Sequence, residues 1–202
     1  MSPRVLLATR NPKKLAELRR IVEPHVPGIE VLGLDDVAPY AEPAETEATF
    51  EANALIKARA AVTAVRLPAL ADDSGLCVDA LNGMPGVLSA RWSGRSKDDA
   101  ANNALLLAQT VDVPSERRGA QFRCAMALVL PDGVEVVQTG VMSGQLLREG
   151  RGTGGFGYDP LFVADGQQLS NGELAPADKD AISHRGRALR AIVPDLVAAL
   201  DR

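Results

Sequence analysis

The sequence has few of the residues on which several classes of protein depend. Among its 202 residues are only two cysteines, Cys77 and Cys124, each of which lies within an apolar run. They are 124 − 77 = 47 positions apart, so they form no ligand pair for zinc, and they favour buried free thiols over a disulfide. The first residues also lack the long apolar core of a secretory signal. We therefore expect a reduced, cytoplasmic protein.

Long hydrophobic runs and a strong excess of one charge are also missing. No apolar stretch approaches the roughly 20 residues that a bilayer span needs, which excludes a membrane span. The chain has 22 Lys and Arg against 26 Asp and Glu, giving a net charge of −4, which argues against a protein that coats duplex DNA. A small anionic ligand held by a few cations remains compatible. With 46% hydrophobic residues, we expect one folded domain over residues 1–202.

The apolar pattern predicts both strands and helices. Strands are expected at 5–8, 29–32, 68–71, 76–78, 122–130 and 134–137. Helices are expected at 12–22, at 50–65 with Thr49 as its N-cap, at 98–110 and at 181–200 with Pro194 as a possible kink, and loops at 35–48, 82–97 and 150–160. Strand–helix units at the start and a hairpin in the middle indicate an α/β fold with α+β character and a mixed sheet.

The segment from Thr9 to Lys14 joins the first predicted strand to the first predicted helix. A helix N-terminus offers unpaired N–H groups and the positive end of the helix dipole, which favour an anion. Thr9 and Asn11 can donate side-chain hydrogen bonds, and Lys14 adds a full charge. The segment is compatible with a phosphate site and also with a plain helix cap. It is not a P-loop, because the required glycines are missing.

Two adjacent carboxylates, Asp72 and Asp73, follow an apolar segment and precede Ser74 and Gly75. We expect the strand to end there in a turn. Adjacent carboxylates at the end of a buried strand repel each other unless a cation or a proton compensates. Mg²⁺ would suit, because it takes one or two carboxylates and completes its shell with waters and substrate phosphates. The alternative is an Asx turn with one aspartate in water.

Other charged and polar side chains could complete such a site. Glu45 and Glu47 lie in the predicted acidic loop. Asn53 and Lys57 share a face of the helix predicted at 50–65, because they are four residues apart. Lys57 is a candidate for a second phosphate contact, although a solvated helix lysine fits the pattern as well.

Residues 150–160 form a segment unusually rich in glycine, which contains the pattern G-x-G-x-x-G twice. A dinucleotide site would need a helix to begin inside that pattern, and Gly157 and Pro160 oppose one. We predict instead a loop whose bare backbone approaches a ligand, with Phe156 or Tyr158 available to stack on a base. A flexible surface loop is the alternative.

Further polar residues precede or begin the last predicted helical stripe. Lys179 is followed by His184 and Arg185. His184 is one of only two histidines in the chain, and the cation Arg185 is its direct neighbour. These side chains offer hydrogen-bond donors that could bind purine ring oxygens. Such a pair is also typical of an ordinary protein surface.

Taken in order, these segments resemble the inosine triphosphate pyrophosphatase family, also called the XTP/dITP diphosphatases. The resemblance extends over nearly the whole chain, from the segment at 8–14 to the residues at 183–186. Its most specific stretches are T-F-E-A-N-A with K-A within 49–58, A-D-D-S-G-L at 71–76, P-G with S-A-R within 85–91, G-T-G-G-F-G-Y-D-P at 152–160 and S-H-R-G at 183–186.

The resemblance implies a two-lobed α/β fold on a long mixed sheet, with the active-site cleft between the lobes, and usually a homodimer. It implies Mg²⁺-dependent cleavage of deaminated purine nucleoside triphosphates (ITP, dITP, XTP) between the α- and β-phosphates. The products would be the nucleoside monophosphate and pyrophosphate. Such an enzyme would clear these nucleotides from the pool.

The resemblance also implies roles for single residues. Asp73 would be the catalytic carboxylate, which contacts the metal and orients or deprotonates water, and Glu45 and Asp72 would assist at the metal. The triphosphate would be held by Thr9, Arg10, Asn11, Pro12, Lys13, Lys14, Lys57 and Ser74. The sugar and base would be held by Phe156, Gly157, Tyr158, Asp159, Lys179, His184 and Arg185. Whether Glu45 or Glu47 assists the metal stays open.

Base selection would be a matter of hydrogen bonding. A donor such as Arg185 would pair with the 6-oxo group of ITP or XTP, whereas the 6-amino donor of ATP would leave it unpaired. GTP also has a 6-oxo group, and the sequence does not indicate how its 2-amino group would be excluded.

Other functions stay open. One is a pyrophosphatase for pyrimidine or modified nucleotides. Another is a non-catalytic nucleotide-binding module, which would use residues 9–14 and the glycine-rich segment but would not need Asp72 and Asp73. We expect no nucleic-acid polymer and no membrane as a partner.

Overall fold

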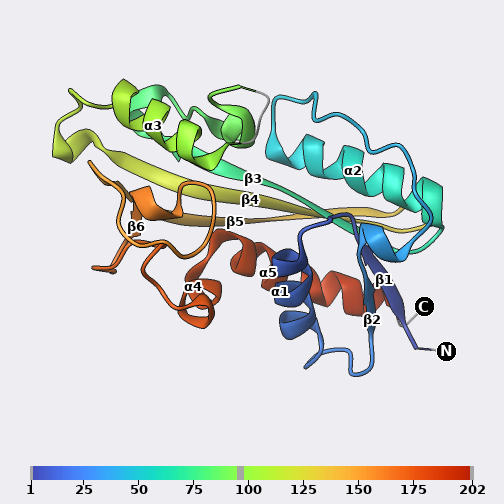
Figure 1. The fold of residues 1–202 in the computed structure, drawn as a ribbon. Helices are drawn as coiled ribbons and strands as arrows, with labels where there is room; N and C mark the ends of the chain where they lie inside the picture. Colours follow the sequence, from blue (N-terminus) through green and yellow to red (C-terminus); the bar gives the residue numbers. More distant parts are fainter. Residues whose placement is uncertain (1, 95–97, 201–202) are drawn as a thin grey trace. The chain divides into compact units, whose positions relative to one another are not determined.

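Figure 1 shows the computed structural model, which describes residues 2–94 and 98–200. Within these residues, six strands form one sheet in the order β2-β1-β3-β4-β5-β6. The strands are β1 (Arg4–Leu7), β2 (Glu30–Leu32), β3 (Ala69–Val78), β4 (Gly119–Val129), β5 (Glu135–Leu146) and β6 (Phe162–Ala164). β1 pairs in parallel with β2 and β3, whereas β5 and β6 are antiparallel. The predicted mixed sheet is confirmed.

The chain divides into two compact units. Unit 1 consists of residues 1–73, 124–140 and 185–202, and unit 2 of residues 74–123 and 141–184. Each unit has its own hydrophobic core, formed by buried side chains of that unit alone.

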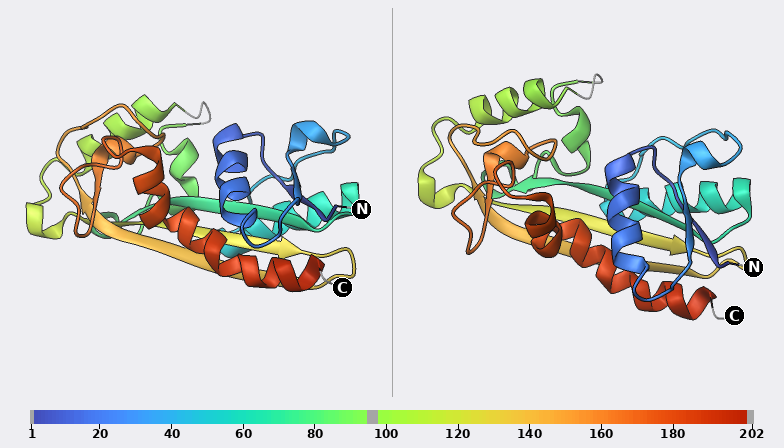
Figure 2. Two further views of the ribbon diagram at one scale, coloured as in Figure 1. Left: turned by 90° about the horizontal axis from the view of Figure 1, so that it is seen from below. Right: turned by 60° about the horizontal axis from the view of Figure 1, so that its bottom comes forward.

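Unit 1 contains α1 (Pro12–Val22), α2 (Phe50–Val65) and almost all of α5 (His184–Leu200). α1 and α5 cover one face of the sheet, and α2 covers the other (Figures 1 and 2). The core on the first face joins Leu18 of α1 and Ile192 of α5 to Leu70 of β3, all with 0% exposure. The helices of unit 1 therefore place side chains on both faces of β3.

Unit 2 contains α3 (Asp99–Gln109) and the short α4 (Pro176–Ile182). Its core includes Phe122 of β4 and Phe162 of β6, whose rings meet edge to face with centroids 4.9 Å apart. Short 3-10 helices lie at Leu34–Asp36, Asp79–Leu81, Gly86–Arg91, Ser115–Arg117 and Asp159–Leu161, and the first, third and fifth of them overlap predicted loops.

The helix starts follow local chemistry. Asn11 caps α1 by accepting a hydrogen bond from the Lys13 amide, and Pro12 occupies the first turn, where its missing N–H costs nothing. Thr49 caps α2 in the same way through the Ala52 amide. The N-cap predicted at Thr49 is confirmed, as is the helix predicted at 98–110.

The largest error of the sequence interpretation concerns the acidic pair. The predicted turn at Asp72–Gly75 is wrong, because β3 continues without interruption from Ala69 to Val78. Charged residues seldom lie in a buried strand, but side chains from distant helices neutralise these. Gly75 allows a close approach: a Cβ there would lie 2.4 Å from both the Gly86 carbonyl oxygen and the Ser89 hydroxyl oxygen.

The C-terminal helix also differs from the prediction. The predicted helix at 181–200 is two helices, because Ser183 is extended (φ −64°, ψ 149°) and ends α4 before α5 begins at His184. α5 continues through Pro194.

Other predictions erred mainly at element boundaries. β6 was not predicted, most of α4 lies before the start of the predicted helix, and the strands of the hairpin are longer than expected. The part of the predicted loop at 95–97 lies outside the described residues. No helix in the described part of the chain is long and apolar enough to cross a membrane.

Candidate active site

The two adjacent carboxylates of β3 point to opposite faces of the sheet, because successive side chains of a strand alternate. Asp72 lies on the face of α1 and α5, and its partners are Lys14 and Arg185. Asp73 lies on the face of α2, and its partners are Asn53 and Lys57. Both carboxylates are buried, with 4% and 7% exposure. The continuous strand therefore places the carboxylates of Asp72 and Asp73 on opposite faces of the sheet, whereas a turn could bring them to the same side.

Asp72 is part of a buried ion cluster. The Lys14 Nζ lies 2.8 Å from both carboxylate oxygens, and the Arg185 Nε donates to Oδ2 at 3.3 Å. Burial alone would raise the pKa of Asp72, but these two positive charges outweigh burial and hold it well below its usual range. Glu17 of α1 adds a second acid, with an oxygen 3.9 Å from an Arg185 nitrogen. Asp72 is therefore a fixed anion that holds two cations.

Asp73 has a different environment. The Asn53 amide donates to Oδ2 at 3.1 Å, while the Lys57 Nζ is 3.9 Å from Oδ1. Burial raises the pKa of Asp73 to about 6, since the attraction of Lys57 only partly opposes it and the negative charge of Glu45 adds to it. A carboxyl group with a pKa near neutrality can both hold and release a proton at working pH.

The acidic loop before α2 brings Glu45, and not Glu47, to this face. Glu45 accepts a hydrogen bond from the Lys57 Nζ at 2.8 Å, and its charge acts on Asp73. Glu47 is exposed, and its backbone N–H and carbonyl are hydrogen-bonded to the Asn53 side chain. The geometry therefore favours Glu45 for a role beside Asp73.

Asn53 is a functional candidate that the sequence analysis placed on the Lys57 face of the helix without giving it a role. It is fully buried and makes three side-chain hydrogen bonds, to the Glu47 N–H, the Glu47 carbonyl and Asp73. Its position on the Lys57 face of the helix was visible in the sequence. Its partners were not, because they come from a loop and from a strand.

The segment from Thr9 to Lys14 forms the start of α1. The Thr9 hydroxyl oxygen accepts from the Asn11 amide, and the Asn11 side chain caps the helix. Lys14 points to Asp72, whereas Lys13 is exposed. Arg10 is exposed and binds Glu42 and Asp35 of the following segment, so its guanidinium group braces the acidic loop.

The residues around Asp73 fit a divalent cation. No group of three or more His, Cys, Asp or Glu side chains arranged to hold a metal occurs among residues 2–94 and 98–200. Mg²⁺ does not require one, since one or two carboxylates and the substrate phosphates suffice. The negative charge of Glu45 helps to raise the pKa of Asp73, and a bound cation would relieve this repulsion. Asp72 fits less well, because both of its oxygens already accept from Lys14.

In unit 2, Asp159 organises the glycine-rich segment. Asp159 has 2% exposure and accepts hydrogen bonds from the Phe156 amide at 2.8 Å, from the Asn171 side chain and from the Lys179 Nζ. The same lysine Nζ lies 5.0 Å from the centre of the Phe156 ring. Gly155 is required beside it, because its φ is +73° and a Cβ would collide with the Asp159 carboxylate.

The two aromatic residues of this segment have different roles. Phe156 is 42% exposed, whereas Tyr158 is 4% exposed and donates its hydroxyl proton to the Ser89 carbonyl at 2.8 Å. Only Phe156 therefore offers a ring face for stacking. His184 is buried and stacks on Phe122, with ring centroids 4.9 Å apart.

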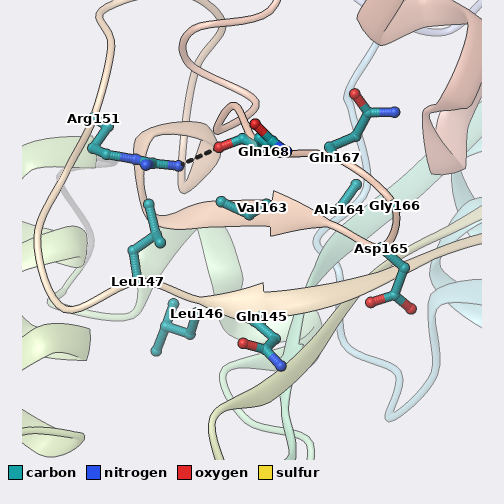
Figure 3. A pocket seen from close by; sticks show the side chains of 10 residues that line it. All are labelled: Gln145, Leu146, Leu147, Arg151, Val163, Ala164, Asp165, Gly166, Gln167 and Gln168. Atoms are coloured by element: carbon teal, nitrogen blue, oxygen red, sulfur yellow. Dashed lines mark hydrogen bonds between the residues drawn. The ribbon is translucent and has the colours of Figure 1, made fainter. Parts of the chain in front are cut away.

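Figure 3 shows how the base of the same segment is attached. The Arg151 guanidinium donates to the Gln168 carbonyl at 2.9 Å, beside a cavity of about 380 Å³ between β5, β6 and residues 165–168. None of the predicted site residues lines this cavity. Arg151 fixes the start of the segment, and Asp159 fixes its end.

The structure thus gathers the predicted site residues into two groups. Within unit 1 lie the acids Asp72, Asp73 and Glu45, the cations Lys14, Lys57 and Arg185, and the start of α1. Within unit 2 lie Ser74, Phe156, Gly157, Tyr158, Asp159, Lys179 and His184. Gly157 is held there by Asp99 and Asn103 of α3. A cleft between the lobes stays a prediction.

Comparison with known proteins places this chain among close relatives. The sequence profile of the Ham1 family matches residues 5–195. A dITP/XTP pyrophosphatase of Nocardia farcinica is 64% identical over 200 residues, which cover 98% of this chain and 97% of that protein. A dITP/XTP pyrophosphatase of Cutibacterium acnes is 56% identical over 98% of both chains.

Solved structures give the same relationship. The nucleoside-triphosphatase, or dITP/XTP pyrophosphatase, of Mycobacterium abscessus is 59% identical with a TM-score of 0.79, covering 95% of this chain and 99% of that one. A HAM1 protein of Coxiella burnetii is 38% identical with a TM-score of 0.89, covering 98% of this chain and all of the other.

Proposed function

The chain belongs to the Ham1 family, and from this premise we propose that it hydrolyses dITP, ITP and XTP to the nucleoside monophosphate and pyrophosphate. It is thus a nucleoside triphosphate pyrophosphatase that removes deaminated purines from the nucleotide pool. Relatives that bear the name dITP/XTP pyrophosphatase support this over nearly the full length of the chain.

The observation that carries the proposal is the opposite environment of two adjacent carboxylates. Asp72 is held as an anion by two cations, whereas the pKa of Asp73 is raised to about 6. Pairs of acids whose environments separate their pKa values are typical of acid–base catalysis. A module that only binds nucleotides would not need this arrangement.

Asp73 is the proposed catalytic residue. Its carboxylate accepts a proton from the water whose oxygen attacks the α-phosphorus, as the bond from that phosphorus to the bridging oxygen breaks and pyrophosphate leaves. Asn53 and Lys57 hold the two carboxylate oxygens in place for this step. Lys57 also carries positive charge toward the region in which phosphate charge accumulates.

The triphosphate site is proposed at the start of α1 and along Lys14 and Lys57. The N-terminus of α1 favours an anion. The remaining members of this group are Thr9, Arg10, Asn11, Pro12, Lys13 and Ser74. Asp72 already orders the side chains of Lys14 and Arg185 before the substrate binds. Little side-chain entropy is therefore lost on binding.

The metal is proposed to be Mg²⁺, with Asp73 and Glu45 as the residues that hold it and Asp72 as a more distant contributor. When bound, Mg²⁺ would neutralise charge on the phosphates and lower the pKa of a water molecule. The lysine between the two carboxylates, Lys57, keeps them close together before the ion arrives.

The base and sugar are proposed to bind at the glycine-rich segment of unit 2. Phe156 presents an exposed ring for stacking, and Asp159 with Lys179 orders the loop that carries it. Gly157, Tyr158 and His184 complete the group, with Arg185 as a candidate reader of the 6-oxo group. We further propose a single two-lobed domain, a homodimer and a cytoplasmic location.

The test is pyrophosphate release with Mg²⁺ across dITP, ITP, XTP, dGTP, ATP and the pyrimidine triphosphates. We expect pyrophosphate from the deaminated purines and little from the others. Preferential cleavage of pyrimidine or modified nucleotides would replace the substrate class. Nucleotide binding without turnover would favour a sensing module. Light scattering of the purified protein measures whether it is a dimer.

A further inference from the structure

We infer that Asn53 is a positioning residue that sets the distance between Asp73 and the acidic loop, and so builds the pair of carboxylates that receives the metal. This inference rests on the proposed function, since it assigns Asp73 and Glu45 to the metal. It adds a residue of α2 that touches neither substrate nor metal in that proposal.

Asn53 is buried, and its side-chain amide takes part in three hydrogen bonds. Its exposed fraction is 0%, so any polar atom of the side chain left without a partner would destabilise the fold. The side-chain oxygen accepts from the Glu47 N–H at 2.9 Å. The nitrogen donates to the Glu47 carbonyl at 3.2 Å and to Asp73 Oδ2 at 3.1 Å. An amide is the group that can satisfy one donor and two acceptors at once.

The three hydrogen bonds of Asn53 connect the acidic loop to β3. Two of them hold both backbone groups of Glu47, as a neighbouring strand would, and fix the loop two residues after Glu45. The third orients the carboxylate of Asp73. One side chain therefore links the acidic loop directly to Asp73 of β3.

Lys57 places a positive charge near both acids. The Lys57 Nζ lies 2.8 Å from a Glu45 oxygen and 3.9 Å from an Asp73 oxygen. Lys57 can attract both carboxylates but cannot fix their orientation, because an ammonium group is a point charge on a flexible stem. Asn53 supplies the direction that Lys57 lacks, since an amide hydrogen bond depends on angle.

Groups that orient metal ligands typically cost about 10–100-fold in metal affinity or activity when they are removed. We therefore expect Asn53→Ala to weaken the binding of Mn²⁺, used as a paramagnetic probe in the absence of nucleotide, by about 10–100-fold. For dITP hydrolysis, kcat should fall by a similar factor while KM changes little, because Asn53 contacts no phosphate in this arrangement.

Asn102 of α3 provides a matched control. It is also a buried helix asparagine (2% exposed), and it accepts from the Ser93 amide and hydroxyl and donates to the Ala90 carbonyl. Asn102→Ala should lower the thermal midpoint of unfolding about as much as Asn53→Ala does, and should leave Mn²⁺ affinity unchanged. The difference between the two variants isolates positioning from stability.

Two further variants keep the test decisive if Asn53→Ala folds poorly. Asn53→Ser retains a small polar group and should keep part of the Mn²⁺ affinity. Asn53→Asp keeps the acceptor for the Glu47 amide but loses the donor to Asp73, and should still lower kcat.

Equal Mn²⁺ affinities for the Asn53 and Asn102 variants, or no Mn²⁺ binding by the wild type, would overturn the inference. A wild type that binds Mn²⁺ but does not cleave dITP would instead overturn the proposed function.

Discussion

The two faces of β3 treat the same residue type in opposite ways. On the face of α1 and α5, Asp72 lies between Lys14 and Arg185, which hold its pKa below the usual range. On the face of α2, Asp73 has one amide donor and a more distant lysine, and burial raises its pKa to about 6. The two aspartates are adjacent in the chain, so the difference comes from which helix packs on which face.

This comparison separates structural from chemical roles. An acid that is charged throughout the working pH range serves as an anchor for cations. An acid whose pKa lies near neutrality can exchange a proton during a reaction. Four experiments test whether the two aspartates have these separate roles.

The largest expected effect is on turnover. Asp73→Asn removes the proton acceptor but keeps the shape of the side chain, so we expect a loss of about 10²–10⁴-fold in kcat. Binding of dITP should persist, because the proposed phosphate contacts come from other residues. Initial rates of pyrophosphate release, with equilibrium binding as the control, measure both. Near-normal turnover would remove Asp73 from the centre of the reaction.

The next effect is on stability, and it falls on the other face. Asp72→Asn leaves the buried cations Lys14 and Arg185 without their shared anion. Breaking a buried ion pair in this way costs about 3–5 kcal/mol of unfolding free energy. Urea unfolding at neutral pH measures the loss. A change below about 1 kcal/mol, typical of exposed ion pairs, would show that the cluster is more hydrated than its burial indicates.

Arg185→Ala tests whether Arg185 serves as a buried ion-pair partner of Asp72 or as a hydrogen-bond donor to the base of the substrate. Its contacts with Asp72 and Glu17 favour the first role, and losing a charged hydrogen bond costs about 1.5–3 kcal/mol. We therefore expect hydrolysis of dITP and of dATP, which has a 6-amino group in place of the 6-oxo group, to fall by the same factor. The ratio of the two kcat/KM values is the readout. A selective loss with dITP would assign Arg185 to reading the 6-oxo group.

The smallest effect is a pH dependence of stability. The pKa of Asp73 rises from 3.8 when unfolded to about 6 when folded. Between these values the folded state binds more protons, so wild-type stability falls as pH rises through this window, by about 1–3 kcal/mol. In magnesium-free buffer, Asp73→Asn should be more stable than the wild type above pH 6 and equal to it below pH 3.8.

The matched comparison is Asp72→Asn, for which the expected change of stability with pH has the opposite sign. Because the folded pKa of Asp72 is lowered, its contribution to stability is present above the unfolded value of 3.8 and disappears as the pH falls below it. Parallel pH profiles for the two variants would contradict the assignment of the two faces.

Local patterns in the sequence were enough for much of the fold. Pro12 at the start of α1, the Thr49 cap of α2 and the apolar stripes predicted these helices, because capping and periodicity depend on residues a few positions apart. The two buried thiols were also predicted correctly, as Cys77 and Cys124 are free and buried.

The strand through Asp72 and Asp73 could not be predicted in the same way. Lys14 and Arg185, which compensate the charge of Asp72, lie 58 and 113 positions from it in the chain. Local propensity favours a turn at such a sequence, and the tertiary partners reverse that preference. The contacts of Asn53 with the acidic loop and with Asp73 were hidden for the same reason.

The partition of β3 into two faces also has a consequence for how this protein can change over generations. The side-chain hydrogen bonds of Asn53 end on Glu47 and Asp73, whereas those of Lys14 end on Asp72. A substitution near Asn53 and a substitution near Lys14 that leave the charge unchanged should therefore have additive effects on stability. The two can accumulate in either order. Charge does cross the sheet, since Asp72 influences the pKa of Lys57. Epistasis between the two faces should be confined to substitutions that add or remove a charge, and the remaining positions can drift separately.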